Sequence, residues 1–294
     1  MVWVNALVQG LLLGGLFALF ATGLSLAFGV MKFVNLAHGD LAILGAFLAV
    51  STTATLDISP WLALLVVVPV MAALGYLLQR YFFNYTIGDN PLPSILVTFG
   101  LGVVIQNALL ERYSADSRGL DAGSVETASI KLTDGISIGW LPLIVLLVAV
   151  GVLVGLQLFV SRTRLGRAFR ATSDDPVTAR LMGVNDRNVY AVVMAIAFAT
   201  VAVAGVFLGI RQTFGPSDGP AQLLVGFEAV VIGGLGSLWG TLLGGAIIGV
   251  AQTVGNQVDV ETGWLSGPLL GHLIFLLVLV FKPNGLLGRS RRTS

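Results

Sequence analysis

Long apolar segments, separated by short polar or helix-breaking stretches, are the feature that most restricts what this chain can fold into. They cover residues 6–30, 36–55, 60–80, 92–110, 140–160, 189–210, 223–235, 239–256 and 266–282. Most of them approach the roughly 20 residues that an α-helix needs to cross a bilayer. Because only 11% of the residues are charged and 56% are hydrophobic, the chain belongs to the membrane class. We therefore expect an all-α fold, a polytopic integral membrane helical bundle that forms one transmembrane domain over residues 1–294.

Helix-breaking residues mark the ends of these segments. They are Ser59-Pro60, Gly88 to Pro91, Gly215-Pro216 and Gly267-Pro268. The segment 223–235 is short for a span, and its length suits a broken or re-entrant helix as well as a crossing. The sequence thus predicts about eight or nine membrane segments, with this one in doubt.

The basic residues indicate which helix ends face the cytoplasm, since short cytoplasmic loops are rich in lysine and arginine. Residues 161–188 carry six arginines, and Arg80 and the arginine-containing tail 289–292 add to the positive charge. We place these three regions in the cytoplasm and the polar loop 111–139 outside. Counting back through five segments from 161–188 then places the N-terminus outside.

A short sequence within the loop 161–188 has the pattern of a complete helix with its own caps. Asp175 suits the N-cap, Pro176 suits the first helical position, and Gly183 suits the left-handed residue that follows a helix. Such a short helix is not stable alone in water. We expect a helix over 175–182 that docks into a partner on the cytoplasmic side.

A polar cluster divides the second apolar segment from the first. Asn35, His38 and Asp40 fall within six residues of one another. At membrane depth, such a break is tolerated only when it lines a cavity or is buried in protein, and ionisable groups there indicate function. These residues are our candidates for the translocation path. The alternative is an ordinary cytoplasmic turn beside Lys32, with Asp40 near the start of the next helix.

Glycines at four-residue spacing are frequent among the 37 in the chain. Gly236, Gly240 and Gly244 form the longest such series, which predicts a small-residue ridge where two helices approach closely. The simpler interpretation is that the glycine face packs two helices of one bundle together. The alternative is that the glycines permit sliding or unwinding during a transport cycle.

Two further ionisable residues lie inside apolar segments. Glu228 is expected either to cap the start of a short helix at the interface or to face a cavity or pair with an arginine. His272 is more typical of a hydrogen-bonded bundle residue than of a metal ligand. The chain has no cysteine, and no helical His or carboxylate pair has metal-ligand spacing, so we expect no metal site and no catalytic site.

The sequence also limits the source of energy. A P-loop needs a glycine–lysine step, but the three lysines follow Met31, Ile130 and Phe281. The chain is therefore not an enzyme of the P-loop ATPase kind, and an ATP-driven process would need a separate polypeptide. The net charge of +1 argues against a nucleic-acid partner.

Three regions resemble one family, in the right order along most of the chain. The N-terminal block GLLLGGLFALFATGLSLAFGVMKFVNLAHGDLAILGAFLA (10–49) is similar to the signature of permease subunits of branched-chain amino acid ABC importers. The block 161–185 resembles their cytoplasmic coupling loop, and 227–249 resembles their glycine-rich C-terminal block. The loop 111–139 shows only weak similarity.

The resemblance assigns a role to the short capped helix, which would sit in a groove of an ATPase subunit. Val177 and Leu181 would share the docking face, and Arg180 would meet acidic groups at the rim of the groove. The residues expected to couple ATP hydrolysis to transport are Asp175, Pro176, Val177, Ala179, Arg180, Leu181 and Gly183.

The resemblance also implies partners. These are two cytoplasmic ATP-binding-cassette ATPases, a homologous and usually non-identical second permease subunit, an extracytoplasmic substrate-binding protein and the lipid bilayer. ATP would be used by the partners, so no cofactor is expected in this chain. The location implied is the bacterial or archaeal cytoplasmic membrane.

The implied substrates are branched-chain amino acids or a related small polar solute, with specificity mostly in the binding protein. The alternative is a stand-alone secondary transporter or channel for a small solute such as urea or an amide, which would use two matching half-helices.

Overall fold

The computed structural model describes residues 1–88, 90–133 and 136–288, so the predicted cytoplasmic arginines 289, 291 and 292 lie outside the described residues. The α-helices are α1 (Val2–Met31), α2 (His38–Leu56), α3 (Pro60–Tyr81), α4 (Leu92–Tyr113), α5 (Trp140–Arg162), α6 (Arg164–Asp174), α7 (Pro176–Leu181), α8 (Asp186–Arg211), α9 (Gly219–Gly233), α10 (Leu238–Thr262) and α11 (Gly267–Phe281). Two 3₁₀ turns, Phe83–Tyr85 and Gly123–Val125, and two strands, β1 (Ser129–Thr133) and β2 (Ile136–Gly139), complete the described elements.

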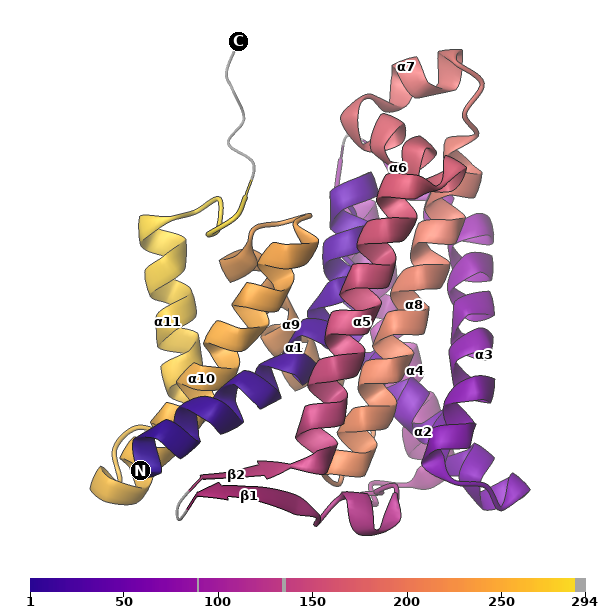
Figure 1. Ribbon diagram of the computed structural model, residues 1–294. Helices are drawn as coiled ribbons and strands as arrows, with labels where there is room; N and C mark the ends of the chain where they lie inside the picture. The colour runs from indigo at the N-terminus through magenta and orange to yellow at the C-terminus, as the bar shows by residue number, and fades with distance from the viewer. Residues whose placement is uncertain (89, 134–135, 289–294) are drawn as a thin grey trace.

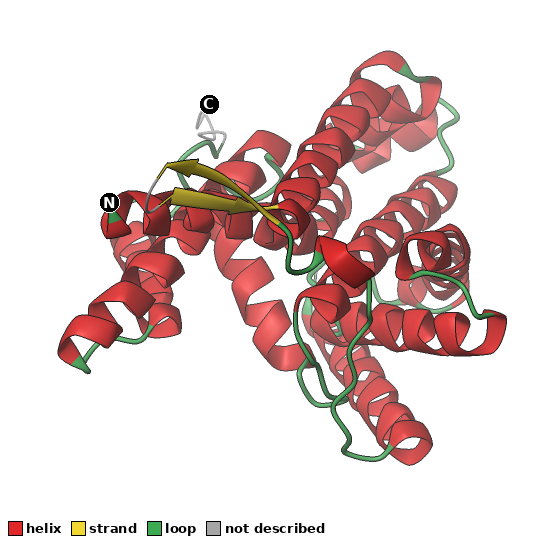
Figure 2. Ribbon diagram, turned by 60° about the horizontal axis from the view of Figure 1, so that its bottom comes forward, coloured by secondary structure: helices red, strands yellow, loops and turns green. Residues whose placement is uncertain are grey.

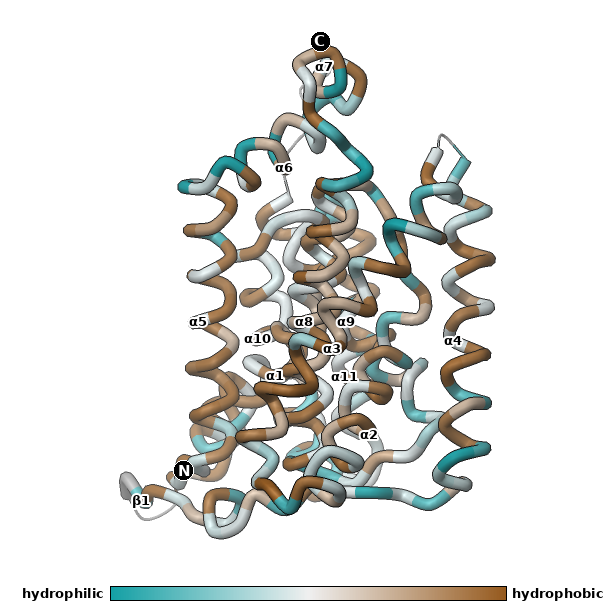
Figure 3. Tube along the Cα trace, turned by 90° about the vertical axis from the view of Figure 1, so that its right-hand side faces the viewer, coloured by the Kyte–Doolittle hydropathy of each residue, from teal (hydrophilic) through white to brown (hydrophobic). Residues whose placement is uncertain are grey.

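The fold is a helical membrane bundle, as the apolar segments predict. Each of the nine expected segments contains a helix. Seven helices of the described chain are long and apolar enough to cross a membrane, and α9 and α11 are shorter apolar helices. Apolar residues dominate the middle of the bundle, and polar residues gather toward its two ends (Figure 3).

The two long polar regions lie at opposite ends of the bundle. The loop that carries α6 and α7 stands at one end, and the N-terminus and the β1–β2 hairpin lie at the other (Figure 1). This arrangement matches the sides assigned from the arginines. The sequence did not predict the hairpin, which is the only sheet of the described chain (Figure 2). It is held against α1 by Gln9, whose Nε2 donates to the Ser137 carbonyl at 2.6 Å.

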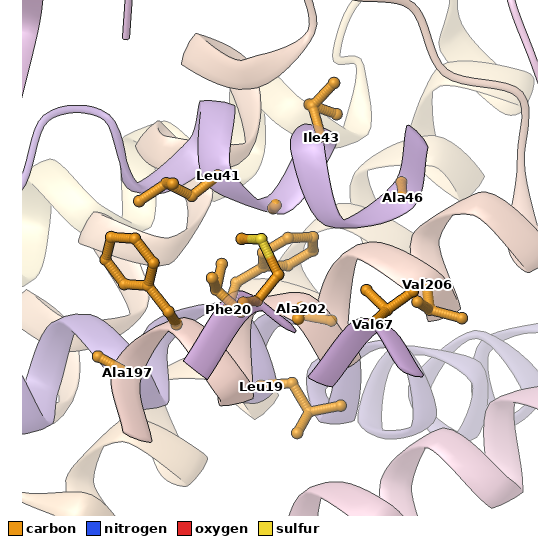
Figure 4. Close-up of a cluster of buried hydrophobic side chains, with 14 of the residues drawn as sticks. Leu19, Phe20, Leu41, Ile43, Ala46, Val67, Ala197, Ala202 and Val206 are labelled. Atoms are coloured by element: carbon orange, nitrogen blue, oxygen red, sulfur yellow. The ribbon is translucent and has the colours of Figure 1, made fainter. Parts of the chain in front are cut away.

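Helix α1 is the centre of the bundle. It packs against α5, α8, α9 and α10. The most apolar stretch of α1 is 83% buried within the chain, whereas the most apolar stretches of α3 and α5 are only 22% buried. Leu19 and Phe20 of α1 lie in a core with Leu41 and Ile43 of α2 and Ala202 of α8 (Figure 4). The outer faces of α3 and α5 remain for lipid or a partner.

Two helices begin inside the bundle, where their first residues touch. A methyl group added to Gly39, in the first turn of α2, would collide with the carbonyl oxygen of Gly219 at the start of α9. The carboxylate of Asp40 lies against Gly219 and against Gly102, which is near the middle of α4. Only glycine allows the two backbones to come so close.

The glycines of the predicted ridge separate into different contacts. Gly240 and Gly244 face the backbone of α9, while their neighbours Gly245 and Gly249 face the backbone of α1. Gly236 is not part of α10: it precedes the helix in a turn with φ of 82°, where it meets Gly29 of α1. The expected continuous ridge is thus wrong at Gly236, because Gly234 and Gly236 break the chain between α9 and α10.

The substitution Gly244→Ala is expected to destabilise the protein by about 1–3 kcal/mol, because the methyl group would meet the Ala229 carbonyl and push α9 away from α10. Gly155→Ala on α5 is the matched control, since nothing lies within 4 Å of the added carbon there. The thermal midpoint of the detergent-solubilised protein, followed by size-exclusion chromatography, measures both. Equal midpoints would show that α9 and α10 are not held by this contact.

Candidate functional site

Helix α7 has the caps that its sequence predicts. Asp175 is the N-cap, and its Oδ1 accepts from the backbone N–H of Val177 at 2.9 Å and of Thr178 at 3.1 Å. At the other end, Gly183 has φ of 83° and its N–H donates to the Arg180 carbonyl at 2.9 Å. The N–H of Val184 then reaches the Ala179 carbonyl at 3.0 Å, which completes a Schellman motif.

The apolar side chains of α7 point away from the bundle. Val177 is 64% exposed, Leu181 82% and Met182 80%. Ala179 is buried, so its methyl group packs against this chain and not against a partner. Arg180 bonds to Asp186 at the start of α8, with Nη2 2.6 Å from Oδ2. Its nearest acidic partner is therefore within the chain, and the exposed apolar tip is formed by Val177, Leu181 and Met182.

Acidification is expected to loosen α7 only below the ordinary carboxyl range. The Thr178 hydroxyl, and then the N–H groups of Thr178 and Val177, hold the pKa of Asp175 below its usual 3.8. Since the folded pKa is the lower one, the cap stabilises α7 fully above pH 3.8 and is lost as the pH falls through the folded value.

At neutral pH, Asp175→Ala should therefore speed amide exchange in α7 several-fold, while Asp175→Asn keeps an accepting oxygen and most of the protection. Hydrogen exchange with mass spectrometry measures the difference. Equal exchange in the two variants would exclude the cap as the cause.

Helix α6 fixes α7 to the end of α1. The Ser173 hydroxyl donates to the Gly29 carbonyl at 2.6 Å. Phe169 is buried and meets Phe159 of α5 edge-on, with ring centroids 5.7 Å apart. Gly29 in turn touches Gly236 in the turn before α10. The loop that carries α6 and α7 is thus in direct contact with α1, and through α1 with the α9–α10 turn.

The polar cluster lies inside the protein and not in a surface turn. Asn35, His38 and Asp40 are all buried. The ring Nε2 of His38 is 2.8 Å from the Phe20 carbonyl of α1, and Asp40 accepts from Gln106 Nε2 at 2.8 Å. Asn35 Oδ1 accepts from the N–H of Ala37 at 3.1 Å, at the interruption before α2. Asp40 lies in the first turn of α2, as the turn interpretation expects, but all three side chains are buried within the protein and not at its surface.

Glu228 neither caps a helix nor pairs with an arginine. It is 1% exposed in the second half of α9, and its Oε1 lies 2.6 Å from Nδ1 of His272 on α11. The expected cap is wrong because α9 begins at Gly219, so Glu228 lies in the second half of the helix. His272 is the hydrogen-bonded bundle residue that the sequence predicts.

A cavity of about 510 Å³ lies between the upper parts of α1, α5 and α6 and the α9–α10 turn. Ser25, Gly29, Gln157, Arg170 and Trp239 are among the residues that line it. Asn35, His38 and Asp40 are not part of its lining. Sequence reasoning missed this cavity and the Ser173 contact, because their residues come from distant segments. The sequence signals were Ser25 and Gln157, two polar residues in apolar runs.

Comparison with known proteins extends these observations. The family described as branched-chain amino acid transport system / permease component matches residues 6–281. The chain is 32% identical to the high-affinity branched-chain amino acid transport system permease protein BraD of Pseudomonas aeruginosa, over 98% of this chain and 96% of that protein. It is 27% identical to the permease protein LivH of Escherichia coli K12, with the same coverage of both chains.

A similar fold occurs in a solved structure of PsaBC from Streptococcus pneumoniae in complex with Fab, with a TM-score of 0.50 and 14% identity over 95% of this chain and 93% of that one. The family match covers nearly the whole bundle, including α7, the interruption between α1 and α2, and the paired glycines of α10. This multi-pass membrane protein therefore belongs to the permease component family of branched-chain amino acid transport systems.

Proposed function

We propose that the chain is the transmembrane permease subunit of an ATP-binding-cassette importer that moves branched-chain amino acids across the cytoplasmic membrane. The observation that carries the proposal is α7, a helix capped at both ends whose apolar side chains are exposed and held away from the bundle. Exposed apolar tips of this kind are typical of docking surfaces. ATP hydrolysis would be supplied by separate ATPase subunits that receive α7 in a groove.

The proposed assembly contains two cytoplasmic ATPases, a second homologous permease subunit and an extracytoplasmic binding protein. The most apolar stretches of α3 and α5 are mostly exposed in this chain, which leaves large apolar faces for lipid and for the second permease. We propose a non-identical permease partner, in line with the family resemblance.

We propose that the translocation path runs beside the first turns of α2 and α9. These turns are held in place by Asn35, His38 and Asp40. Their polar atoms mostly face protein groups, and Asp40 lies between the first turn of α9 and α4. The alternative function, a stand-alone channel, does not explain why α6 holds a helix with exposed apolar side chains away from the bundle. The importer is the better explanation of α6 and α7.

Reconstitution tests the proposed function. Proteoliposomes that contain both permeases and the ATPases, with binding protein and ATP supplied on their respective sides, should accumulate labelled leucine. Uptake should cease when either ATP or the binding protein is omitted. Leucine entry into vesicles that contain the permease alone would contradict the importer and favour a channel or secondary transporter.

A further inference from the structure

The cavity between α1, α5, α6 and the α9–α10 turn combines an apolar wall with a charged rim. Leu26 and Val30 of α1, Val160 of α5 and Leu238 of α10 contribute aliphatic side chains. Arg170 and Asp174 of α6 contribute opposite charges. At about 510 Å³, the cavity has the size of known small-molecule sites.

The two charges are available to a ligand. Arg170 and Asp174 are four residues apart on α6, so their side chains emerge on the same face of the helix. Both are exposed, and neither takes part in an ion pair between described residues. An α-amino acid carries its carboxylate and ammonium groups on one carbon, and adjacent positive and negative side chains match that pair of charges.

We propose that this cavity is a binding site for the transported amino acid on the ATPase side of the membrane, where Arg170 binds the carboxylate and Asp174 the ammonium group of an aliphatic amino acid. The aliphatic side chain lies against Leu26, Val30 and Val160. The inference rests on the proposed function for the identity of the ligand, and on the cavity itself for the place and the recognising groups.

The site is built into the coupling loop. Arg170 and Asp174 belong to α6, and the residue after Asp174 is the N-cap of α7. When α7 moves with its ATPase partner, Arg170 and Asp174 therefore move with it. The Ser173–Gly29 hydrogen bond connects this movement to α1. Occupancy of the cavity and the position of α7 are thereby linked.

Direct binding to the assembled transporter tests the site. Labelled L-leucine is titrated by scintillation proximity onto permeases and ATPases in lipid nanodiscs, without binding protein or nucleotide. Leucinamide, which lacks the carboxylate, and 4-methylpentanoate, which lacks the ammonium group, serve as competitors. The wild-type protein should bind leucine saturably and prefer it to both competitors.

The variants identify the recognising groups. Arg170→Gln should weaken leucine binding about tenfold and remove the preference over leucinamide, because one charge-assisted contact is lost. Asp174→Asn should do the same relative to 4-methylpentanoate. Arg167→Gln, a substitution on α6 outside the cavity, should leave all affinities unchanged.

Two outcomes would overturn the site. One is the absence of saturable leucine binding, and the other is equal affinities in the three variants. ATP-driven leucine uptake by the same preparation, once the binding protein is added, separates the two proposals. Uptake without binding to the cavity refutes this site alone, whereas a preparation that imports no aliphatic amino acid refutes the proposed function.

Discussion

Replacing Val177 and Leu181 together by aspartate is expected to abolish ATP-driven uptake while the protein still inserts and folds. The two side chains are 64% and 82% exposed, so the bundle does not depend on them. In a docked complex, each aspartate would place an unpaired carboxylate in an apolar groove. Such burial costs several kcal/mol per group, which should weaken the association with the ATPase by more than about a hundredfold.

Three measurements on the variant check this expectation. Co-purification with the ATPases reports the association, uptake into proteoliposomes reports transport, and the elution profile in detergent reports the fold. The conservative pair Val177→Ile and Leu181→Met is the matched control, because it keeps the apolar surface and should retain transport. If the aspartate pair transports at the wild-type rate, α7 is not the docking element.

The substitution His272→Ala is expected to destabilise the protein by about 1–3 kcal/mol, because it leaves the buried carboxyl group of Glu228 without its hydrogen-bond partner. Glu228 is 1% exposed, and its second oxygen, Oε2, already has no hydrogen bond within the described chain. The remaining oxygen depends on the imidazole of α11. The thermal midpoint in detergent measures the loss.

The double substitution Glu228→Leu and His272→Leu separates the pair from simple packing. It removes both polar groups, so it should cost much less than His272→Ala alone. Glu228→Gln in the wild-type background should also be mild, since the amide needs no counter-charge. A double variant as unstable as His272→Ala would mean that the contact between α9 and α11, and not the buried carboxylate, sets the stability.

Local features of the sequence predicted the helices and their caps well. Apolar length, prolines and glycines are read along the chain, so the nine segments and the caps of α7 followed directly. The predicted ridge at Gly236 and the predicted cap at Glu228 were wrong for one shared reason. Both depended on where α9 begins and ends, and short apolar helices have the least certain boundaries.

Contacts between distant segments were beyond the sequence. The pairs Glu228–His272 and Ser173–Gly29 join residues that are separated by 44 and 144 positions. No periodicity connects such residues, because their meeting depends on how whole helices pack.

The sequence by itself determined that the chain crosses a membrane, which loops carry the charge that orients it, and that a short capped helix stands on the arginine-rich side. These properties follow from hydrophobic length, charge and backbone preferences, all of which act locally. Only the tertiary structure decided that α2 and α9 begin inside the bundle, that Asp40 and His38 are held by interior partners, and that Ser25, Arg170 and Asp174 share one cavity. In a bilayer, helices associate through close packing and a few polar contacts, and the geometry that brings those groups together belongs to the whole bundle.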